Sequence, residues 1–292
     1  MNLISTKLKL RFITIAVNEQ IFTIVRKGMN DAATAMQLEA ELVGTPDVSA
    51  REMIKLVRRA IADRVDGVAL NVFESHTFTD VIAEAKTAGI PVVAFNIDAS
   101  RGTSGTLSSI AQHFHAAGEA LGRRAAASID KGDAAIITVH DEGVGALEER
   151  LAGIQDGLRD RDLQWRIVCT GQDPARGAEL LCDAFRRAPV RAIFGTGQGD
   201  TEAAGLAAKA LAPLRPYVAG FDLSPGIVDL IADGFIDCAV DQQPYAQGFY
   251  PVVQLALYLR YGLLPSSLDA GANLIDRSNL ESARRLSRQA IR

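Results

Sequence analysis

Cysteine is scarce in this chain of 292 residues, which contains only Cys169, Cys182 and Cys238. Their number is odd and their spacing is not that of a zinc site, so the sequence predicts neither a disulfide framework nor structural zinc. We interpret all three as small buried hydrophobic residues. If the protein is exported, a Cys169–Cys182 disulfide is the alternative.

Long apolar runs and basic blocks are also missing. The apolar runs have the length of β-strands and are broken by polar residues, which excludes a membrane-spanning helix. Lys and Arg total 31 against 35 Asp and Glu, and the charges are scattered, so nucleic acid is not predicted as a partner. With 48% hydrophobic and 23% charged residues, the composition is that of a globular protein large enough for two lobes.

The N-terminus lacks the features of a secretion signal. Lys7, Lys9 and Arg11 interrupt the only apolar segment there, MNLISTKLKLRFITIAV. We therefore expect either a cytosolic protein or the mature form of an exported one, whose signal peptide has been removed.

Sequence signatures of common enzymes are absent as well. The chain has no G-x-S-x-G elbow, no Walker loop and no H-E-x-x-H motif. The glycines of Gly195–Gly199 do not have dinucleotide-binding spacing, and His113 and His115 cannot face each other on a helix. We predict no metal and no cofactor. One catalytic alternative is a general base within His140–Glu142, although nothing near it in the sequence supplies a nucleophile.

Short apolar runs alternate with amphipathic segments of helical length along nearly the whole chain. This alternation predicts an α/β protein with parallel sheets covered by helices on both faces. A loop rich in Gly, Ser and Thr interrupts the rhythm, and the break near Gly102–Gly118 predicts two sheets, each in its own lobe. Strands are predicted at Phe12–Val17, Ala40–Val43, Gly67–Val72, Pro91–Phe95, Ala134–Val139, Arg166–Cys169, Ala192–Gly195, Val218–Phe221 and Ile236–Val240, and the last long helix at Tyr245–Tyr261.

Polar side chains follow most of these strands at their C-terminal ends. Parallel strands share one direction, so these ends meet at one edge of each sheet, where open α/β sheets bind ligands. For any single residue, helix capping or a loop hydrogen bond is the alternative, but the whole set predicts a binding site. The candidates are Asn18, Gln20 and Phe22 after the first strand, Asn96 and Asp98 after the fourth, Asp141 and Arg150 after the fifth, Gln198 after the seventh, Asp222 and Gln242 after the last two, and His113 beside the break.

The segment Val218–Gly248 carries the clearest signal. One apolar run ends at Asp222, and Ser224-Pro225 then supplies an N-cap and the first residue of a helix. The next run ends beside Gln242, and Pro244 prevents the strand from continuing. A carboxylate accepts hydrogen bonds and an amide both donates and accepts them, so Asp222 and Gln242 suit a polyhydroxy compound.

Four segments in order along the chain carry a family resemblance: Asp66–Val68, Ala88–Phe95, Gly220–Asp222 and Ala270–Asp276. They resemble segments of the type I periplasmic sugar-binding proteins, the ribose-, galactose- and xylose-binding components of ABC importers. The resemblance implies two Rossmann-like lobes with parallel sheets, joined by three crossovers that form a hinge. The N-terminal lobe would hold residues 1–112 and 243–272, and the C-terminal lobe residues 113–242 and 273–292.

The resemblance also implies roles for several candidates. By position, Asp222 accepts hydrogen bonds from sugar hydroxyls, Gln242 is a hinge glutamine, and Arg150 reaches the ring oxygen or hydroxyls. Phe22 is implied to stack on the sugar ring. Asn96 stands where many members have the Asp of an Asp-Arg pair, and the arginine is missing here. Ribose or galactose specificity is therefore not implied.

The function implied by the resemblance is non-enzymatic binding of a carbohydrate or polyol between the lobes. The protein would be a monomer of the periplasm that delivers its ligand to an ABC permease in the inner membrane. A cytosolic enzyme acting on a small polar substrate is one alternative, and a sensor that presents its closed form to a receptor is another. The repressors of this fold carry a helix-turn-helix ahead of it, for which a first strand near Phe12 leaves no room.

Overall fold

The computed structural model describes residues 7–287, 289 and 291, which form two compact units. Unit 1 contains the described residues up to Gln112 together with Gln243–Ala270, and unit 2 contains His113–Gln242 together with the described chain from Gly271 to residue 289. The last crossing between units follows Ala270, two residues before the predicted position. Residues 1–6 of the segment considered as a secretion signal, and 288, 290 and 292 of the predicted C-terminal lobe, lie outside the described residues.

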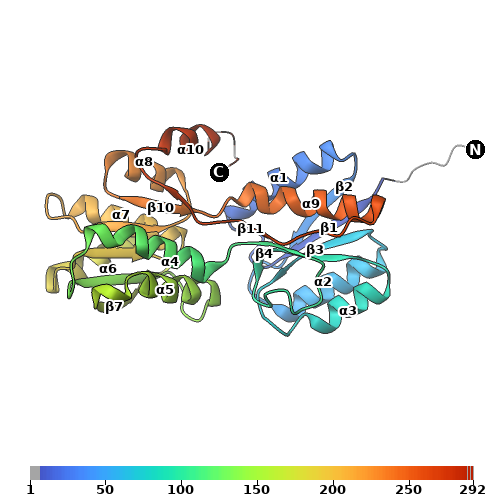
Figure 1. Ribbon diagram of the computed structural model, residues 1–292, viewed down its shortest axis with the longest axis horizontal. Helices are drawn as coiled ribbons and strands as arrows, with labels where there is room; N and C mark the ends of the chain where they lie inside the picture. The colour runs from blue at the N-terminus through green and yellow to red at the C-terminus, as the bar shows by residue number, and fades with distance from the viewer. Residues whose placement is uncertain (1–6, 288, 290, 292) are drawn as a thin grey trace, which may run out of the picture. The chain divides into compact units, whose positions relative to one another are not determined.

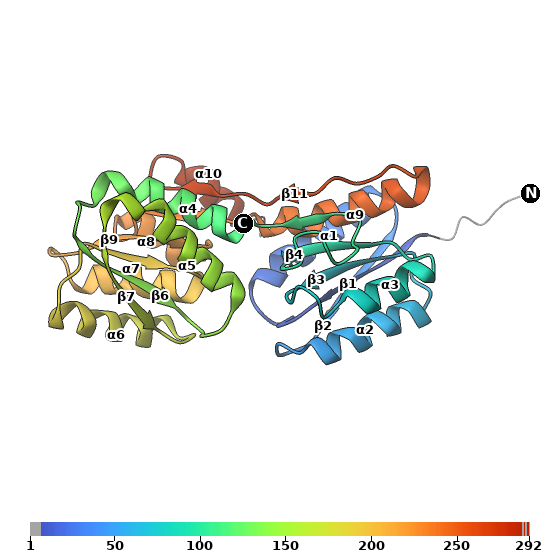
Figure 2. The same cartoon turned by 60° about the horizontal axis from the view of Figure 1, so that its bottom comes forward.

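Unit 1 is built on a six-stranded sheet in the order β11-β5-β4-β3-β1-β2, in which every pair is parallel. Helices α1 and α9 lie side by side over one face, and α2 and α3 cover the other (Figures 1 and 2). The elements are β1 Lys9–Thr14, α1 Ile21–Ala35, β2 Glu39–Gly44, α2 Ala50–Ala62, β3 Gly67–Val72, α3 Thr79–Thr87, β4 Val92–Asp98, β5 Ser109–Ala111, α9 Pro244–Tyr261 and β11 Leu268–Asp269.

Unit 2 repeats this plan with a six-stranded sheet in the order β12-β10-β9-β8-β6-β7. Its pairs are parallel except β10 with β12, which is antiparallel. The elements are α4 Phe114–Ala125, η1 Ala126–Ser128, β6 Ala134–Val139, α5 Gly145–Gly157, η2 Arg159–Arg161, β7 Gln164–Cys169, α6 Pro174–Arg187, β8 Ala192–Gly195, α7 Gln198–Ala210, β9 Tyr217–Phe221, α8 Pro225–Asp233, β10 Cys238–Asp241, β12 Asn273–Ile275 and α10 Leu280–Ser287.

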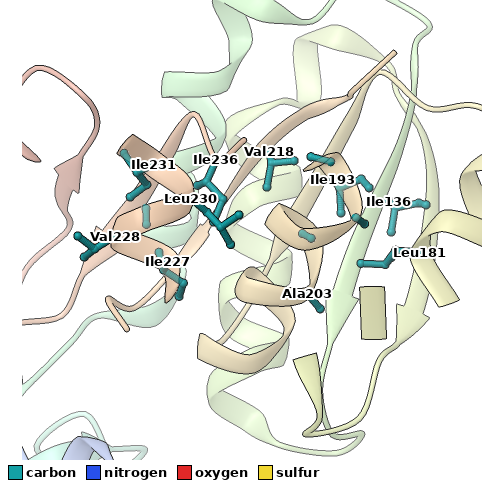
Figure 3. Close-up of a cluster of buried hydrophobic side chains, with 14 of the residues drawn as sticks. Ile136, Leu181, Ile193, Ala203, Val218, Ile227, Val228, Leu230, Ile231 and Ile236 are labelled. Carbon is teal, nitrogen blue, oxygen red and sulfur yellow. The ribbon is translucent and has the colours of Figure 1, made fainter. Parts of the chain in front are cut away.

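Both faces of the unit 2 sheet are buried because its strands are apolar on both sides. Ile193 and Val218 lie on the face that packs against α6, α7 and α8, as Figure 3 shows for part of this core. Phe194, the residue after Ile193 in β8, lies on the opposite face, in the core formed with α4 and α5. Successive side chains of a strand point to opposite faces, so two cores require near-continuous apolar runs. The α/β class with two mostly parallel sheets, predicted from those runs, is confirmed.

Helices α4 and α5 approach each other closely because glycine lines their contact. A Cβ atom at Gly153 would lie 2.1 Å from the carbonyl oxygen of His115, and one at Gly118 would lie 2.3 Å from that of Arg150. Helices α1 and α9 meet in the same way, since a Cβ at Gly248 would lie 2.0 Å from the carbonyl oxygen of Val25. These distances are far below van der Waals contact, so backbone packs directly on backbone in both pairs.

Several local predictions need correction. Strand β1 begins three residues earlier and ends three residues earlier than predicted, because the chain turns at Ala16, whose φ is 46°. The short strands β5, β11 and β12 were not predicted. All three cysteines are free thiols; Cys182 and Cys238 are buried as predicted, whereas Cys169 is exposed.

Asp276 should make the stability of unit 2 depend on pH. It follows β12, where it accepts hydrogen bonds from the side chain and backbone of Ser278 and pairs with Arg124 of α4 at 3.1 Å. Ser278 first, and then Arg124, lower the pKa of this carboxyl, opposed by partial burial. A lowered pKa stabilises the fold above the unfolded-state pKa, and that contribution is lost as the pH falls through the folded-state value.

We expect Asp276→Asn to reduce the free energy of unfolding at pH 7 and to reduce it less near pH 3, where the contribution of the ionised carboxyl is being lost. Urea titrations followed by the fluorescence of Trp165, the single tryptophan, would measure this for unit 2. A difference between the two proteins that is the same at both pH values would contradict the prediction.

Candidate functional site

The candidate site of unit 2 lies where its strand order reverses. Strands β6 and β8 are neighbours, but β6 leads into α5 on one face of the sheet and β8 leads into α7 on the other. Open parallel sheets bind ligands at the carboxyl ends of two such strands, because the loops diverge there and leave backbone and side-chain groups accessible. The polar residues described next cluster at this edge.

Arg150 is the central residue of the cluster. It lies in α5, is 4% exposed, and donates from Nη1 to the carbonyl oxygen of Thr196 at 2.8 Å. Its Cζ lies 4.3 Å from the centroid of the Phe221 ring and 5.2 Å from that of Phe114. A guanidinium between aromatic rings is stabilised by their π electrons and is held in one orientation.

Asp222 and Gln242 adjoin Arg150. The Asp222 carboxylate lies 3.7 Å from Arg150 Nη1 and accepts a hydrogen bond of 2.5 Å from Gln242 Nε2. Asp222 has a φ of 71°, so the backbone leaves the extended conformation of β9 at this residue. Ser224 caps α8, accepting from the backbone N–H of Ile227 at 3.0 Å. The alternative that Asp222 serves only as the helix cap is therefore wrong.

Charges in the cluster partly compensate one another. Burial lowers the pKa of the Arg150 guanidinium, and the carboxylates of Asp222 and Asp200 act in the opposite direction. Asp200, in the first turn of α7, is 0% exposed and accepts a hydrogen bond of 2.6 Å from the backbone N–H of Thr196. It thus fixes the residue whose carbonyl oxygen accepts from Arg150. Asp200 was missed as a site residue because its burial depends on strands far away in the sequence.

Glycines let the start of α7 approach the sheet. Thr201 Oγ1 accepts a hydrogen bond of 2.9 Å from the backbone N–H of Phe221 at the end of β9. A Cβ atom would lie 2.3 Å from this oxygen at Gly195 and 2.2 Å from it at Gly220. Side chains at either position would push α7 away from the strand ends, so these two glycines set the geometry of the cluster.

Asn96 of unit 1 lies in a buried network of amides. Its Oδ1 accepts from Asn71 Nδ2 at 3.0 Å, and its Nδ2 donates to Gln247 Oε1 of α9 at 2.9 Å. Asn71 also donates to Thr14 Oγ1 at 3.2 Å. The network ties the carboxyl ends of β1, β3 and β4 to α9, so both ends of the Asn96 amide contact the protein itself. Asn71 and Gln247 carried no distinct signal in the sequence.

The remaining predicted residues lie in unit 1, except His113, Asp141 and Gln198, which lie in unit 2. Phe22 is 2% exposed and packs in the core of unit 1, which does not fit the implied role of stacking on a sugar. Asp98 ends β4 instead of following it, and accepts from Ser100 Oγ at 2.5 Å. Asn18 and Gln20 are exposed before α1, His113 is exposed at the start of unit 2, Asp141 is exposed after β6, and Gln198 is the first residue of α7.

The structure also bears on metals and membranes. Nowhere among the described residues do three or more His, Cys, Asp or Glu side chains gather as they would around a metal ion. No helix in the described part of the chain is both long and apolar enough to span a membrane.

The fold agrees with that of known proteins. Residues 11–262 match the family model described as periplasmic binding protein domain. The xylose/arabinose-binding protein XylF of Sulfolobus acidocaldarius is 27% identical over 296 residues, covering 94% of this chain and 72% of that protein.

Two solved structures are similar over nearly the whole chain. A carbohydrate transporter from Acidothermus cellulolyticus 11B, in complex with myo-inositol, has a TM-score of 0.84 and 25% identity, covering 98% of this chain and 100% of its own. An ABC transporter solute-binding protein from Burkholderia graminis C4D1M, in complex with D-arabinose, has the same TM-score and identity, with 95% and 98% covered.

A family model that spans most of the chain defines the class of this protein: it belongs to the periplasmic binding protein family. The type I resemblance predicted from the sequence is confirmed, and the relatives named above are sugar- or polyol-binding proteins.

Proposed function

We propose that this protein binds a neutral monosaccharide or cyclic polyol and is the solute-binding component of an ABC importer. The observation that carries the proposal is the contact of Arg150, Asp222 and Gln242 at the carboxyl edge of the unit 2 sheet. Together these side chains offer guanidinium donors, carboxylate acceptors and an amide that both donates and accepts hydrogen bonds. A sugar hydroxyl also donates and accepts, so it can satisfy such a set from several sides.

A neutral ligand is favoured by the charges of the cluster. The Arg150 guanidinium already has Asp222 at 3.7 Å, and Asp200 also attracts it. A charged ligand would add an uncompensated charge to a partly buried group of ions, which is costly. The named relatives bind xylose or arabinose, myo-inositol and D-arabinose, all of which are uncharged.

The partners follow from the family. We propose that the protein acts outside the cytoplasmic membrane as a monomer, delivers the sugar to a permease in that membrane, and has no catalytic activity. Asn18, Gln20, Asn96, Asp98, His113, Asp141 and Gln198 remain predicted contributors to ligand binding, through direct contact or by shaping the site.

A thermal-shift screen tests the proposal. Protein refolded from urea, to remove any sugar carried through purification, is heated with D-xylose, L-arabinose, D-arabinose or myo-inositol. Ligand at 100 times its dissociation constant should add about 2.7 kcal/mol to the free energy of unfolding and raise the melting temperature. Glucosamine and gluconate serve as charged controls that should give smaller shifts. A shift with the charged compounds alone, or with none of the neutral ones, would contradict the proposal.

A further inference from the structure

The start of α7 holds the chain on both sides of Asp222. Thr201 Oγ1 accepts a hydrogen bond of 2.9 Å from the backbone N–H of Phe221, the residue before Asp222. The next residue of α7, Glu202, accepts a hydrogen bond of 2.6 Å at Oε2 from Ser224 Oγ, two residues after Asp222. Two neighbouring residues of α7 therefore fix the segment that carries the Asp222 carboxylate at two points.

The Ser224 hydroxyl connects Glu202 to the backbone of the next helix. Ser224 is 4% exposed, donates from Oγ to Glu202, and accepts from the backbone N–H of Ile227 at 3.0 Å. A hydroxyl group has only one hydrogen to donate, so the two bonds together fix its orientation. Without Glu202 the hydroxyl could still cap α8, but the bond that ties Ser224 to α7 would be lost.

The Glu202 carboxylate lies against the first turn of α8. A Cβ atom at Gly226, the second residue of α8, would lie 2.2 Å from Glu202 Oε1 and 2.6 Å from Glu202 Cδ. A side chain at position 226 would therefore displace the carboxylate. A negative charge at a helix N-terminus is also favoured by the helix dipole. The carboxylate is thus held against α8 while its own backbone belongs to α7.

Asp222 has a backbone conformation that needs such support. Its φ of 71° is uncommon for a residue other than glycine, and such conformations persist only where the surrounding structure holds them. The backbone N–H of Asp222 donates to the carbonyl oxygen of Val240 at 2.8 Å, which fixes the residue on the side of β10. Held in this way, the side chain reaches Arg150 and Gln242.

We propose that Glu202 is a positioning residue, which acts through Ser224 to hold Asp222 in its ligand-binding conformation. This inference rests on the proposed function. Without the bond between Glu202 and Ser224, the loop after β9 takes up other conformations, in which the Asp222 carboxylate points elsewhere. The measured dissociation constant then rises in inverse proportion to the fraction of molecules whose loop is competent to bind. Glu202 thus affects the affinity through the geometry of Asp222.

Two substitutions at position 202 test this role. Glu202→Ala removes the acceptor for Ser224 without weakening α7, since alanine is a good helix former. Glu202→Gln keeps an oxygen that can accept the same hydrogen bond. Isothermal titration calorimetry uses whichever of D-xylose, L-arabinose, D-arabinose and myo-inositol binds the wild type most tightly. We expect Glu202→Ala to bind it about fivefold more weakly, which corresponds to a loop that is competent about one fifth of the time. Glu202→Gln should recover most of the affinity.

A double-mutant cycle tests the route through Ser224. Ser224→Ala removes both the bond to Glu202 and the cap of α8, so it should weaken binding at least as much as Glu202→Ala does. In the Ser224→Ala background, Glu202→Ala should cause no further loss of affinity, because the bond is already broken. Equal losses in both backgrounds would show that Glu202 does not act through Ser224, and the inference would be wrong.

The other end of β9 offers a matched control. Asp237, just before β10, accepts a hydrogen bond of 2.8 Å from the backbone N–H of Val218 and pairs with Arg215 at 2.9 Å. Like Glu202 it is a partly exposed carboxylate that holds a residue next to or in this strand, but it does so at the end away from Asp222. Asp237→Ala should lower the free energy of unfolding in urea and leave the dissociation constant unchanged. A loss of affinity as large as that of Glu202→Ala would indicate a general loosening of unit 2 and would contradict the inference.

The remaining outcomes separate this inference from the proposed function. If the wild type binds none of the four compounds, the proposed function fails and this inference fails with it. If the wild type binds one of them and Glu202→Ala binds it equally well, only the inference is overturned. A loss in Glu202→Ala that Glu202→Gln does not recover would also overturn it, because the charge and not the hydrogen bond to Ser224 would then be responsible.

Discussion

Asp222→Asn is expected to weaken sugar binding by at least tenfold. Hydrogen bonds to a charged group contribute about 1.5–3 kcal/mol, and 1.4 kcal/mol corresponds to a factor of ten in affinity. Asparagine is preferred to alanine here because Asp222 has a φ of 71°, a backbone conformation that asparagine adopts more readily than alanine. The substitution keeps an oxygen for Gln242 but removes the charge beside Arg150.

The affinity is measured by calorimetry with the neutral compound that binds the wild type most tightly. Asp229→Asn is the control, since Asp229 is an exposed carboxylate of α8 that pairs with Arg284 at the surface. Asp229→Asn should leave the dissociation constant unchanged. If Asp222→Asn also leaves it unchanged, Asp222 does not contact the ligand.

Gly153→Ala is expected to be the most destabilising single-methyl change in unit 2. The new Cβ would lie 2.1 Å from the carbonyl oxygen of His115 and 2.9 Å from the backbone nitrogen of Glu119. Backbone atoms cannot rotate away as a side chain can, so α4 and α5 must separate. We expect a loss of about 3 kcal/mol in the free energy of unfolding, the upper part of the range for overpacked cores.

Gly145 provides the control within the same helix. It is the first residue of α5, is exposed, and has nothing within 4 Å of its added Cβ. Gly145→Ala should leave stability unchanged or raise it slightly, because alanine favours the helix. Urea unfolding followed by Trp165 fluorescence compares the two. Equal stabilities for the two variants would show that the α4–α5 contact can relax without loss.

The buried central strands were predictable because their signal is local. The bounds predicted for Gly67–Val72, Ala134–Val139 and Ala192–Gly195 are those of β3, β6 and β8, each a mainly apolar run. Strands β5, β11 and β12 were not predictable, since each has two or three residues and forms only by pairing with a distant segment. Leu268, for example, pairs with Ile110, which no local pattern indicates.

The candidate site was predictable only in part, for the same reason. Asp222 and Gln242 follow recognisable strands, and the structure brings them to Arg150. In the sequence, Phe22 cannot be distinguished from an aromatic residue that stacks on a ligand. In the structure, it lies on the buried face of α1. The contact of His140 with Asp200 joins residues that are far apart in the sequence, and no local pattern indicates that Asp200 is buried.

The packing of α9 on α1 determines when unit 1 can be completed during synthesis. Strands β1 to β5 leave the ribosome first. Helix α9, which covers one face of their sheet together with α1, begins only at Pro244, after all of β6 to β10. Until α9 is made, the side of α1 that will pack against Gly248 stays open to water. Exposed apolar surface of this kind promotes aggregation. A nascent chain therefore carries an unfinished first unit through most of its synthesis, while unit 2 lacks only β12 and α10.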